Sequence, residues 1–388
     1  MRVFFLQPLV PHYRAPFFRR LAAEPGLDLV VHTSPETPGQ SLRSVPLGPE
    51  VGFDAILHPC TLRAGGRLYW QADLRFPVGF GRGDVYVMPG SPRYPRNFLL
   101  AAEAKARGAA VVWFSHGYGV GISDRALLLR RTAAARFDHV VLYTDAEVAG
   151  WKAAGFPHDR ITGMNNALEQ GPIRAARDAV SAADVVALRT AHGLVGRRLL
   201  LLVGRLTEKA GAELLIDALP RLPLDVTAVL IGGGESADAL AARVARLGLA
   251  DRVRQIGPLY DEAALAPWFR AASVFVYPGA IGLSIHHAFG YGLPVVTHGD
   301  VRGQMPEFGA LNPGVNGEVF PPGDAAGLAR VLGGLLGDDT RRGRLAAGAR
   351  RTVETGWNID DMVSRMAGAL RAAVSHRTRH GMFPGDDV

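Results

Sequence analysis

The segment VYPGAIGLSIHHAFGYGLPVV (residues 276–296) joins an apolar strand end, a glycine-containing turn, an amphipathic helical pattern and a second strand that starts after Pro294. A glycine turn at the start of a helix presents unbonded backbone N–H groups and the positive end of the helix dipole. Both features favour a bound anion. The segment therefore predicts a phosphate-binding turn between two strands of a parallel sheet.

A second segment, upstream of the first, fits the same chemistry. LLLLVGRL (199–206) is an apolar strand that ends in Gly204 and Arg205, and Lys209 precedes a helix that we expect to end near Leu219. Two cations beyond a strand end, opposite a helix N-terminus, can share the charge of a diphosphate. Each signal alone is weak, because glycine turns and arginines after strands are common in surface loops.

Short apolar runs alternate with helical patterns along the chain, which predicts an α/β fold with parallel sheets covered on both faces. Proline- and glycine-rich loops at 34–52 and 77–95 are long enough to form a substrate rim. In the first half, the expected strands are Val3–Leu6, Leu29–Thr33, Val85–Met88, Ala110–Ser115 and His139–Tyr143, and the expected helices include Arg14–Ala23, Arg96–Arg107 and Asp145–Ala154.

Composition excludes several classes of protein. The chain has 388 residues, 48% of them hydrophobic and 20% charged, which suits two globular domains rather than a disordered chain. The single cysteine, Cys60, cannot form an internal disulfide, and the N-terminal apolar run is too short for a signal peptide. We therefore expect a cytoplasmic protein. No stretch approaches the ~18 apolar residues of a membrane span.

The formal net charge is +7, and arginines supply most of the positive charge. Several of them gather in DRALLLRRTAAARF (124–137), which has the pattern of a basic helix with an apolar stripe. Such a helix suits the anionic inner face of a membrane or an acidic acceptor, although such a face is more often simply solvated. We expect no nucleic-acid partner, because no basic run is interleaved with aromatic residues.

The second half of the chain closely resembles the donor domain of the retaining, nucleotide-sugar-dependent glycosyltransferases of the two-Rossmann-domain (GT-B) type, family 4 and its relatives. The matching motifs, in order, are VGRLTEK (203–209), LIGGGES (230–236), VRQIGPL (253–259), SVFVYPGAIGLS (273–284), GYGLPVV (290–296), MPEF (305–308) and NGEVFPPGD (316–324). The first half matches more loosely.

The resemblance implies two Rossmann-like domains that face each other across a cleft. We place an acceptor domain at residues 1–172, a linker helix at 173–198 and the donor domain at 199–355. The amphipathic segment from Ile359 belongs to a C-terminal helix, 356–377, expected to return to the first domain, and 378–388 forms a frayed tail.

The implied chemistry needs fixed positive charge where the departing diphosphate gains negative charge. Arg205 can supply it together with the amides of the glycine turn. The chain has no Asp-x-Asp pair, so we expect no metal ion and no cofactor besides the nucleotide-sugar co-substrate. The motifs assign donor binding to Gly204, Lys209, Gly257, Gly282, Leu283, Ser284, His287 and Glu307.

Three positions depart from the family pattern. The family lysine position holds Ala210, with Lys209 one residue early. Of the two family glutamates, the first, near the donor sugar and phosphate, is Gly279, and the second, on the ribose hydroxyls, is His287. Histidine can still exchange a hydrogen bond with a ribose or phosphate oxygen, or it can lie in a polar seam between helices, as can His286.

In the first domain, VVWFSHGYG (111–119) places His116 at a strand end with glycines behind it, where an open α/β sheet presents ligand-facing groups. The resemblance assigns His116 to the donor sugar, as a catalytic residue beside Arg205. We assign acceptor binding to Tyr118 and to the aromatic, basic loop of His12, Tyr13 and Arg14.

Three functions remain open from the sequence. The first is a glycosyltransferase that moves a hexose or deoxyhexose from a nucleoside diphosphate to a hydroxyl with retained anomeric configuration. The second is a nucleotide-sugar epimerase or hydrolase on the same fold, because fold does not fix chemistry. The third is a non-catalytic nucleotide-sugar-binding partner, which the missing glutamates suggest. The acceptor is a small hydroxylated molecule or a lipid-linked saccharide.

Overall fold

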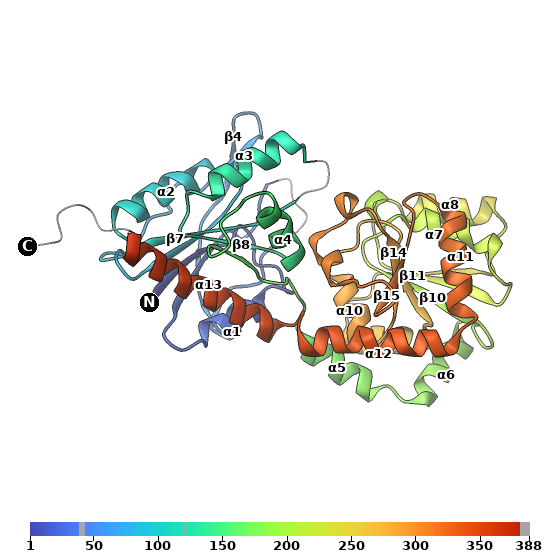
Figure 1. Ribbon diagram of the computed structural model, residues 1–388. Helices are drawn as coiled ribbons and strands as arrows, with labels where there is room; N and C mark the ends of the chain where they lie inside the picture. The colour runs from blue at the N-terminus through green and yellow to red at the C-terminus, as the bar shows by residue number, and fades with distance from the viewer. Residues whose placement is uncertain (39–42, 119–121, 381–388) are drawn as a thin grey trace, which may run out of the picture. The chain divides into compact units, whose positions relative to one another are not determined.

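The computed structural model describes residues 1–38, 43–118 and 122–380. These residues form two compact units (Figure 1). Unit 1 comprises residues 1–118, 122–166 and the C-terminal segment from Ile359, and unit 2 comprises residues 167–358. Gly119, part of the predicted loop 34–52 and the end of the predicted tail lie outside the described residues.

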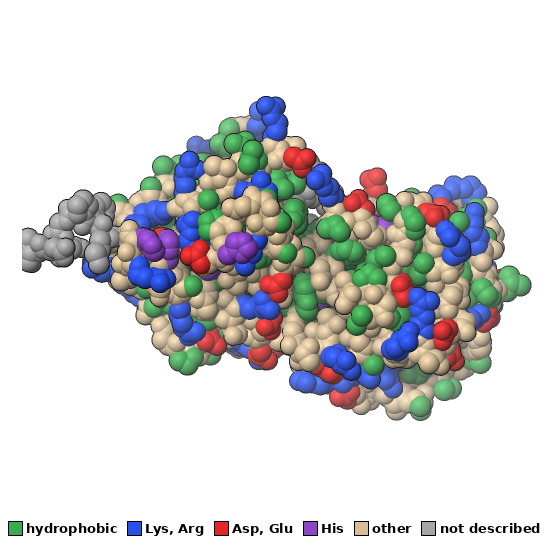
Figure 2. Space-filling view, in the orientation of Figure 1, with side chains coloured by type: hydrophobic (Ala, Val, Ile, Leu, Met, Phe, Trp, Pro, Cys, Tyr) green, Lys and Arg blue, Asp and Glu red, His purple; other side chains and the backbone are tan. Residues whose placement is uncertain are grey.

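Positive charge is not collected in one region of the visible surface. Figure 2 shows Lys and Arg side chains spread over both units, with Asp and Glu side chains among them. The predicted basic helix forms as α3 (Asp124–Ala134), capped by the Ser123 hydroxyl, which accepts the amide of Ala126. Its apolar stripe faces outward, because Leu128 and Leu129 are 54% and 71% exposed.

Unit 1 is built on a parallel sheet with the strand order β3-β2-β1-β6-β7-β8-β9 in the described residues. A separate hairpin joins β4 (Thr61–Arg63) to β5 (Leu68–Trp70). The sheet strands are β1 (Arg2–Leu6), β2 (Asp28–Thr33), β3 (Asp54–Leu57), β6 (Val85–Pro89), β7 (Ala110–Ser115), β8 (His139–Leu142) and β9 (Ile161–Gly163). The helices are α1 (Ala15–Ala22), α2 (Pro95–Ala106), α3 and α4 (Asp145–Ala153), with a short turn η1 (Pro49–Val51).

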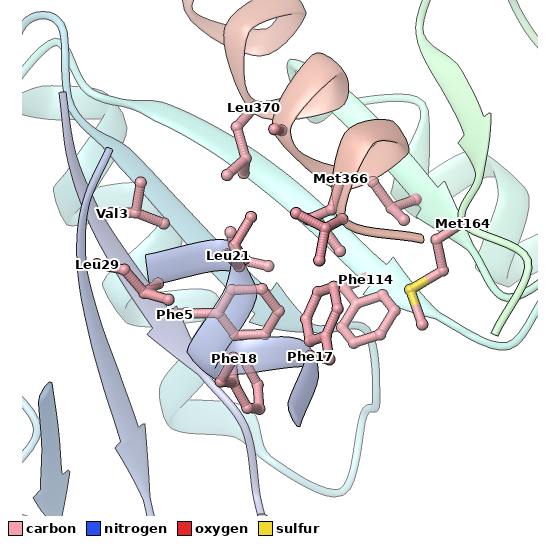
Figure 3. Packing of buried hydrophobic residues seen from close by; sticks show 14 of the residues in the cluster. Val3, Phe5, Phe17, Phe18, Leu21, Leu29, Phe114, Met164, Met366 and Leu370 are labelled. Carbon is pink, nitrogen blue, oxygen red and sulfur yellow. The ribbon is translucent and has the colours of Figure 1, made fainter. Parts of the chain in front are cut away.

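The C-terminal helix α13 (Ile359–His380) packs beside α1 on one face of this sheet. Phe17 and Phe18 of α1 meet Phe5 of the sheet and Met366 of α13 in one buried cluster (Figure 3). The opposite face carries a second core that includes Phe4, Tyr86 and Trp113. The helix ends at His380, beyond the predicted bound at residue 377, and the Arg377 side chain near this end donates to the carbonyl of Lys105 at 2.6 Å.

Unit 2 repeats the architecture with the strand order β12-β11-β10-β13-β14-β15 among the residues described. The strands are β10 (Arg198–Val203), β11 (Val226–Ile231), β12 (Val253–Gly257), β13 (Val274–Val276), β14 (Val295–His298) and β15 (Gly317–Phe320). The helices are α5 (Gln170–Ala179), α6 (Ala182–Ala191), α7 (Ala212–Ala218), α8 (Ala237–Arg246), α9 (Glu262–Ala271), α10 (Ser284–Gly290), α11 (Ala325–Leu336) and α12 (Asp339–Thr355). Short turns are η2 (Glu208–Ala210), η3 (Leu219–Arg221), η4 (Val301–Gly303) and η5 (Pro306–Ala310).

The segment predicted as a linker, 173–198, forms most of α5 and all of α6, and both helices pack within unit 2 against α9. The order of strands reverses beside β10: the chain adds β11 and β12 on one side, then returns to add β13 on the other. In open α/β sheets, ligands bind beyond the carboxyl ends of the strands at such a switch point.

Candidate functional site

The phosphate elements predicted from the sequence follow the two strands at the switch point of unit 2. β10 and β13 pair in parallel, so the Gly204–Arg205 end and the Tyr277 turn leave the sheet side by side. A Cβ on Gly204 would lie only 3.2 Å from the Tyr277 ring. The Arg205 side chain is exposed at this edge. Gly257, a third predicted donor residue, ends the outer strand β12, and its carbonyl accepts the amide of Gly232.

A buried glutamine, which the sequence analysis did not single out, holds the turn after β13. Gln304 Oε1 accepts the amide of Ile281 at 2.7 Å, and Gln304 Nε2 donates to Thr297 Oγ1 and to the carbonyl of His298, both at 2.9 Å. Thr297 Oγ1 donates in turn to the carbonyl of Gly279 at 3.2 Å. The turn is therefore fixed before any ligand arrives.

The turn also rests directly on the segment that follows β10. The amides of Gly279 and Ala280 donate to the carbonyls of Ala210 and Lys209, both at 2.9 Å. A Cβ on Gly279 would lie 2.0 Å from the Lys209 carbonyl oxygen, so no side chain fits there. This backbone contact therefore explains why glycine stands at the position of the first family glutamate.

Gly279→Ala should destabilise unit 2 by about 2 to 3 kcal/mol, because the clash is with backbone and cannot be relieved by a rotamer change. Urea unfolding measures the effect. The control is Gly343→Ala in α12, where nothing lies within 4 Å of the added methyl and helix propensity should increase stability slightly. Equal stability of the two variants would contradict the tight contact.

Lys209 and Ala210 lie in a short turn rather than in the following helix. η2 spans Glu208–Ala210 and ends at Gly211, whose φ of 64° is left-handed. Lys209 has an exposed side chain, whereas Ala210, at the family lysine position, is fully buried. Position 210 supports the turn with a small buried side chain. The exposed lysine therefore stands one residue before the family position.

The N-terminal end of α10 carries backbone donors and one carboxylate. Within the described residues, the amides of Gly282, Leu283 and Ser284 donate to no protein acceptor, whereas Ile285 and His286 already donate to Gly282 and Leu283. Glu307, in η5, lies close by and is buried: a Cβ on Gly282 would be 3.9 Å from its Oε2. The structure therefore groups four predicted donor residues at this turn.

The side chain of His287 is turned toward α9. Its Nε2 lies 2.8 Å from Glu262 Oε1, which also accepts the Tyr291 hydroxyl at 2.5 Å. Burial raises the pKa of Glu262, but the hydrogen bond and charge of His287 and the Tyr291 hydroxyl outweigh it and lower the pKa overall. His287 thus lies in a polar seam between α9 and α10, which was the alternative to a donor contact in the sequence analysis. Glu262 is its partner in this seam.

His286 lies on a different side of α10 and is fully buried beside Trp357. Neither ring nitrogen has a hydrogen-bond partner among the described residues. Burial lowers its pKa to about 3, so the ring is neutral. It serves packing rather than a surface site.

In unit 1, His116 lies at the end of β7 with its ring stacked on Tyr143 at 3.8 Å between centroids. Burial, with the nearby charges of Arg14 and Arg130, lowers the pKa of His116 to about 4. The imidazole is therefore neutral at pH 7 and can both donate and accept a hydrogen bond. Tyr143, which directly follows β8, was not among the predicted site residues.

Glu147, from α4, fixes the loop that carries His116. Its Oε1 accepts the amides of Gly117 at 2.7 Å and Tyr118 at 3.2 Å, and its Oε2 accepts the amide of Thr144. The side chain is buried, only 2% exposed. The sequence hint was the capping-box pattern Thr144-x-x-Glu147, but the second use of the carboxylate depends on the tertiary fold.

Glu147→Ala should destabilise the protein by about 3 kcal/mol, because it leaves buried amides without an acceptor. Turnover should fall as well, since the His116 loop loses its support. Glu147→Gln keeps one acceptor oxygen and should lose less in both respects. Unfolding and turnover measured on both variants check the role, and unchanged turnover in the folded Ala variant would contradict it.

The predicted acceptor residues lie at different depths of unit 1. His12 is exposed and contacts the Tyr13 ring edge-on at 5.5 Å. Arg14 is buried, with its guanidinium 5.7 Å from the Tyr143 ring centre, so it shares an aromatic neighbour with His116. Tyr118 points its hydroxyl at α4, where a Cβ on Gly150 would lie 1.7 Å from it.

Two parallel α/β units, with a glycine turn and an exposed arginine at the switch point of the second, are typical of a two-Rossmann-domain protein. Residues 197–338 match the sequence model of the family described as glycosyl transferases group 1. The match agrees with the resemblance of the donor domain to the GT-B glycosyltransferases that the sequence predicted.

Several known proteins are similar to this chain. It is 35% identical over 202 residues to a D-inositol 3-phosphate glycosyltransferase of Xylanimonas cellulosilytica, a match that covers 49% of this chain and 46% of the relative. The chain thus spans under half the length of that relative. It is 28% identical over 340 residues, 83% of each chain, to a GDP-mannose-dependent alpha-(1-6)-phosphatidylinositol monomannoside mannosyltransferase of Mycolicibacterium smegmatis.

Among solved structures, Anabaena HepE in complex with UDP superposes with a TM-score of 0.70 at 20% identity and covers 96% of this chain and 99% of its own. This likeness confirms the predicted α/β fold with two Rossmann-like domains. None of the helices in the described residues is long and apolar enough to cross a membrane.

Proposed function

We infer that the protein transfers a sugar from a nucleoside-diphosphate donor to an acceptor hydroxyl, with the donor bound at the switch point of unit 2. The observation that carries this proposal is the pairing of β10 with β13, which sets Arg205 beside the turn that begins α10. An arginine and a cluster of backbone amides at the carboxyl ends of two neighbouring strands suit a diphosphate. The relatives support the donor class, because one is named for GDP-mannose and the HepE structure contains UDP.

The proposed reaction needs no metal ion or other cofactor. As the sugar leaves, negative charge grows on the diphosphate oxygens, and fixed donors stabilise it most effectively when they are held in place beforehand. Gln304 and the Gly279 contact give the turn that rigidity. We propose that His116, as a neutral hydrogen-bonding group, orients the donor sugar and that the anomeric configuration is retained.

His287 and Glu262 should act as a pair on the donor side. We expect His287→Ala and Glu262→Ala each to raise the donor KM about five- to tenfold, because loss of either hydrogen-bond partner releases the other. The double variant should be no worse than the single ones. His286→Ala should lower stability and leave KM unchanged, because the ring is buried away from the seam. Donor-saturation kinetics decide, and a normal KM in His287→Ala would refute the pairing.

The acceptor is proposed to be a hydroxylated molecule bound near His12 and Tyr13. Two of the similar proteins are named for inositol-containing acceptors, one of them a lipid. The exposed leucines of α3, set among arginines, would suit a peripheral contact of this cytoplasmic enzyme with the inner face of a membrane.

Incubation with radiolabelled nucleotide sugars and a panel of inositol and lipid-linked acceptors tests the proposal. A transferase yields label on an acceptor together with free nucleoside diphosphate. An epimerase or hydrolase yields isomerised or free sugar without an acceptor, and a binding partner yields neither. Label that never leaves the donor would refute the transferase function.

A further inference from the structure

Unit 1 contains a cavity of about 410 Å³ on one face of its sheet, away from the His116 loop. The lining strands supply neighbouring residues of one face: Arg2 pairs with Asp28, Phe4 with Val30, and His32 with Ile56 in the strand register. The segment after β5 closes the other side. The lining residues from that segment are Asp73, Arg75, Phe76, Pro77 and Phe80.

The cavity follows from the connection between β3 and β6. In the described residues 58–84 this connection contains the hairpin β4–β5 and no helix. A helix would cover the sheet face with a continuous apolar stripe, whereas here Phe76 and Phe80 stack on each other at 4.6 Å and leave a gap beside Val30 and Ile56. This part of the wall is therefore aromatic and aliphatic.

At one end of the cavity, a carboxylate and two imidazoles lie in a row, and the two imidazoles are hydrogen-bonded to each other. His58 Nδ1 lies 3.1 Å from Asp73 Oδ1, and His58 Nε2 lies 2.9 Å from His32 Nδ1. The carboxylate favours the proton on His58 Nδ1, so His58 Nε2 accepts from His32 Nδ1. His32 Nε2 is then an unprotonated acceptor, on the edge of a ring that lines the cavity.

Both the ring geometry and the charges restrict what can bind. Phe4 stacks on the face of His32 at 3.4 Å, so only the edge of the imidazole is available. Arg2 is paired with Asp84, and burial beside His58 lowers the pKa of His32 to about 3, so this ring is neutral. Charges of both signs line the cavity, from Arg2, Arg75, Asp28 and Asp73, which favours an uncharged ligand.

We propose that this cavity binds a small uncharged molecule with an aromatic ring system and one hydroxyl group, which donates its proton to His32 Nε2. A cavity of about 410 Å³ accommodates two fused rings. The site is separate from the proposed transferase chemistry and does not depend on it, since it lies within unit 1 and shares no residue with the switch-point site.

The test compares 2-naphthol with 2-methylnaphthalene, which has nearly the same shape but no donor. Calorimetry or naphthol fluorescence on the full chain should show saturable one-to-one binding of 2-naphthol, with the methyl compound about fivefold weaker for want of the hydrogen bond. His32→Phe should abolish the difference between the two compounds. No saturable binding of 2-naphthol, or equal affinity for both compounds, would overturn the proposal.

Two tryptophan variants on β3 keep the test clear if His32→Phe does not fold. Ile56 and Leu57 are 48% and 47% exposed, but only Ile56 lines the cavity, because successive side chains of a strand point to opposite faces. Ile56→Trp fills the cavity and should weaken 2-naphthol binding about tenfold or more. Leu57→Trp should bind as the wild type does. Equal affinities in the two variants would place the ligand elsewhere.

Discussion

Arg205→Ala should weaken the binding of nucleoside diphosphates by roughly 2 to 4 kcal/mol, the cost of removing one partner from a desolvated charge pair. The side chain leaves β10 beside the glycine turn after β13, where backbone amides supply the remaining donors. Arg205→Lys keeps the charge but loses the planar fork, so its loss should be smaller. Isothermal titration calorimetry measures both.

Arg246→Ala is the matched control, because Arg246 is an exposed arginine of the same unit at the end of α8. Its diphosphate affinity should equal that of the wild type. A full loss in the control, or none in Arg205→Ala, would mean that the diphosphate does not bind beside β10.

His116→Ala should lower kcat about 100-fold and leave nucleoside diphosphate affinity within about twofold, because the predicted contact is with the sugar as it reacts. His158→Ala, an exposed histidine of the same unit, should be neutral. Since burial, Arg14 and Arg130 hold the pKa of His116 near 4, the ring stays neutral above that pH. The kcat profile of the wild type should therefore show no His116 step near pH 6.5. Full turnover in the alanine variant would remove His116 from the site.

Sequence patterns located the switch-point elements because each is local. Strand β10 contains a run of four leucines. The turn and helix after β13 can be identified from closely spaced glycines and apolar residues. The predicted bounds of β7 match those observed, and α4 ends one residue earlier, at Ala153, because Ala154 caps it.

Long-range contacts explain what the patterns missed. Gly279 was interpreted as a lost glutamate, yet its lack of a side chain reflects the carbonyl of Lys209, a backbone atom from a distant segment. Glu262 lies on another helix from His287, so no spacing rule links them. Arg14, predicted in an acceptor-binding loop, is buried because the chain end returns as α13 and places Met362 beside it.

Glu147 is a second case in which a long-range contact could not be predicted from the sequence. Its capping-box position could be identified from four consecutive residues, and that local role is present. The acceptance of two amides from the His116 loop requires β7 and β8 to be neighbours in the sheet. The sheet topology therefore gives Glu147 a second role, in which it supports the loop that carries His116.

Thermal unfolding of the wild type and of Arg205→Ala with UDP, GDP, ADP and dTDP tests the donor site most directly. Binding at 100 times Kd should stabilise the wild type by ~2.7 kcal/mol with at least one of the four, and the variant should show little stabilisation at the same concentration. If none of the four stabilises the wild type at millimolar concentration, or if the variant responds equally, the donor site is not at the switch point of unit 2.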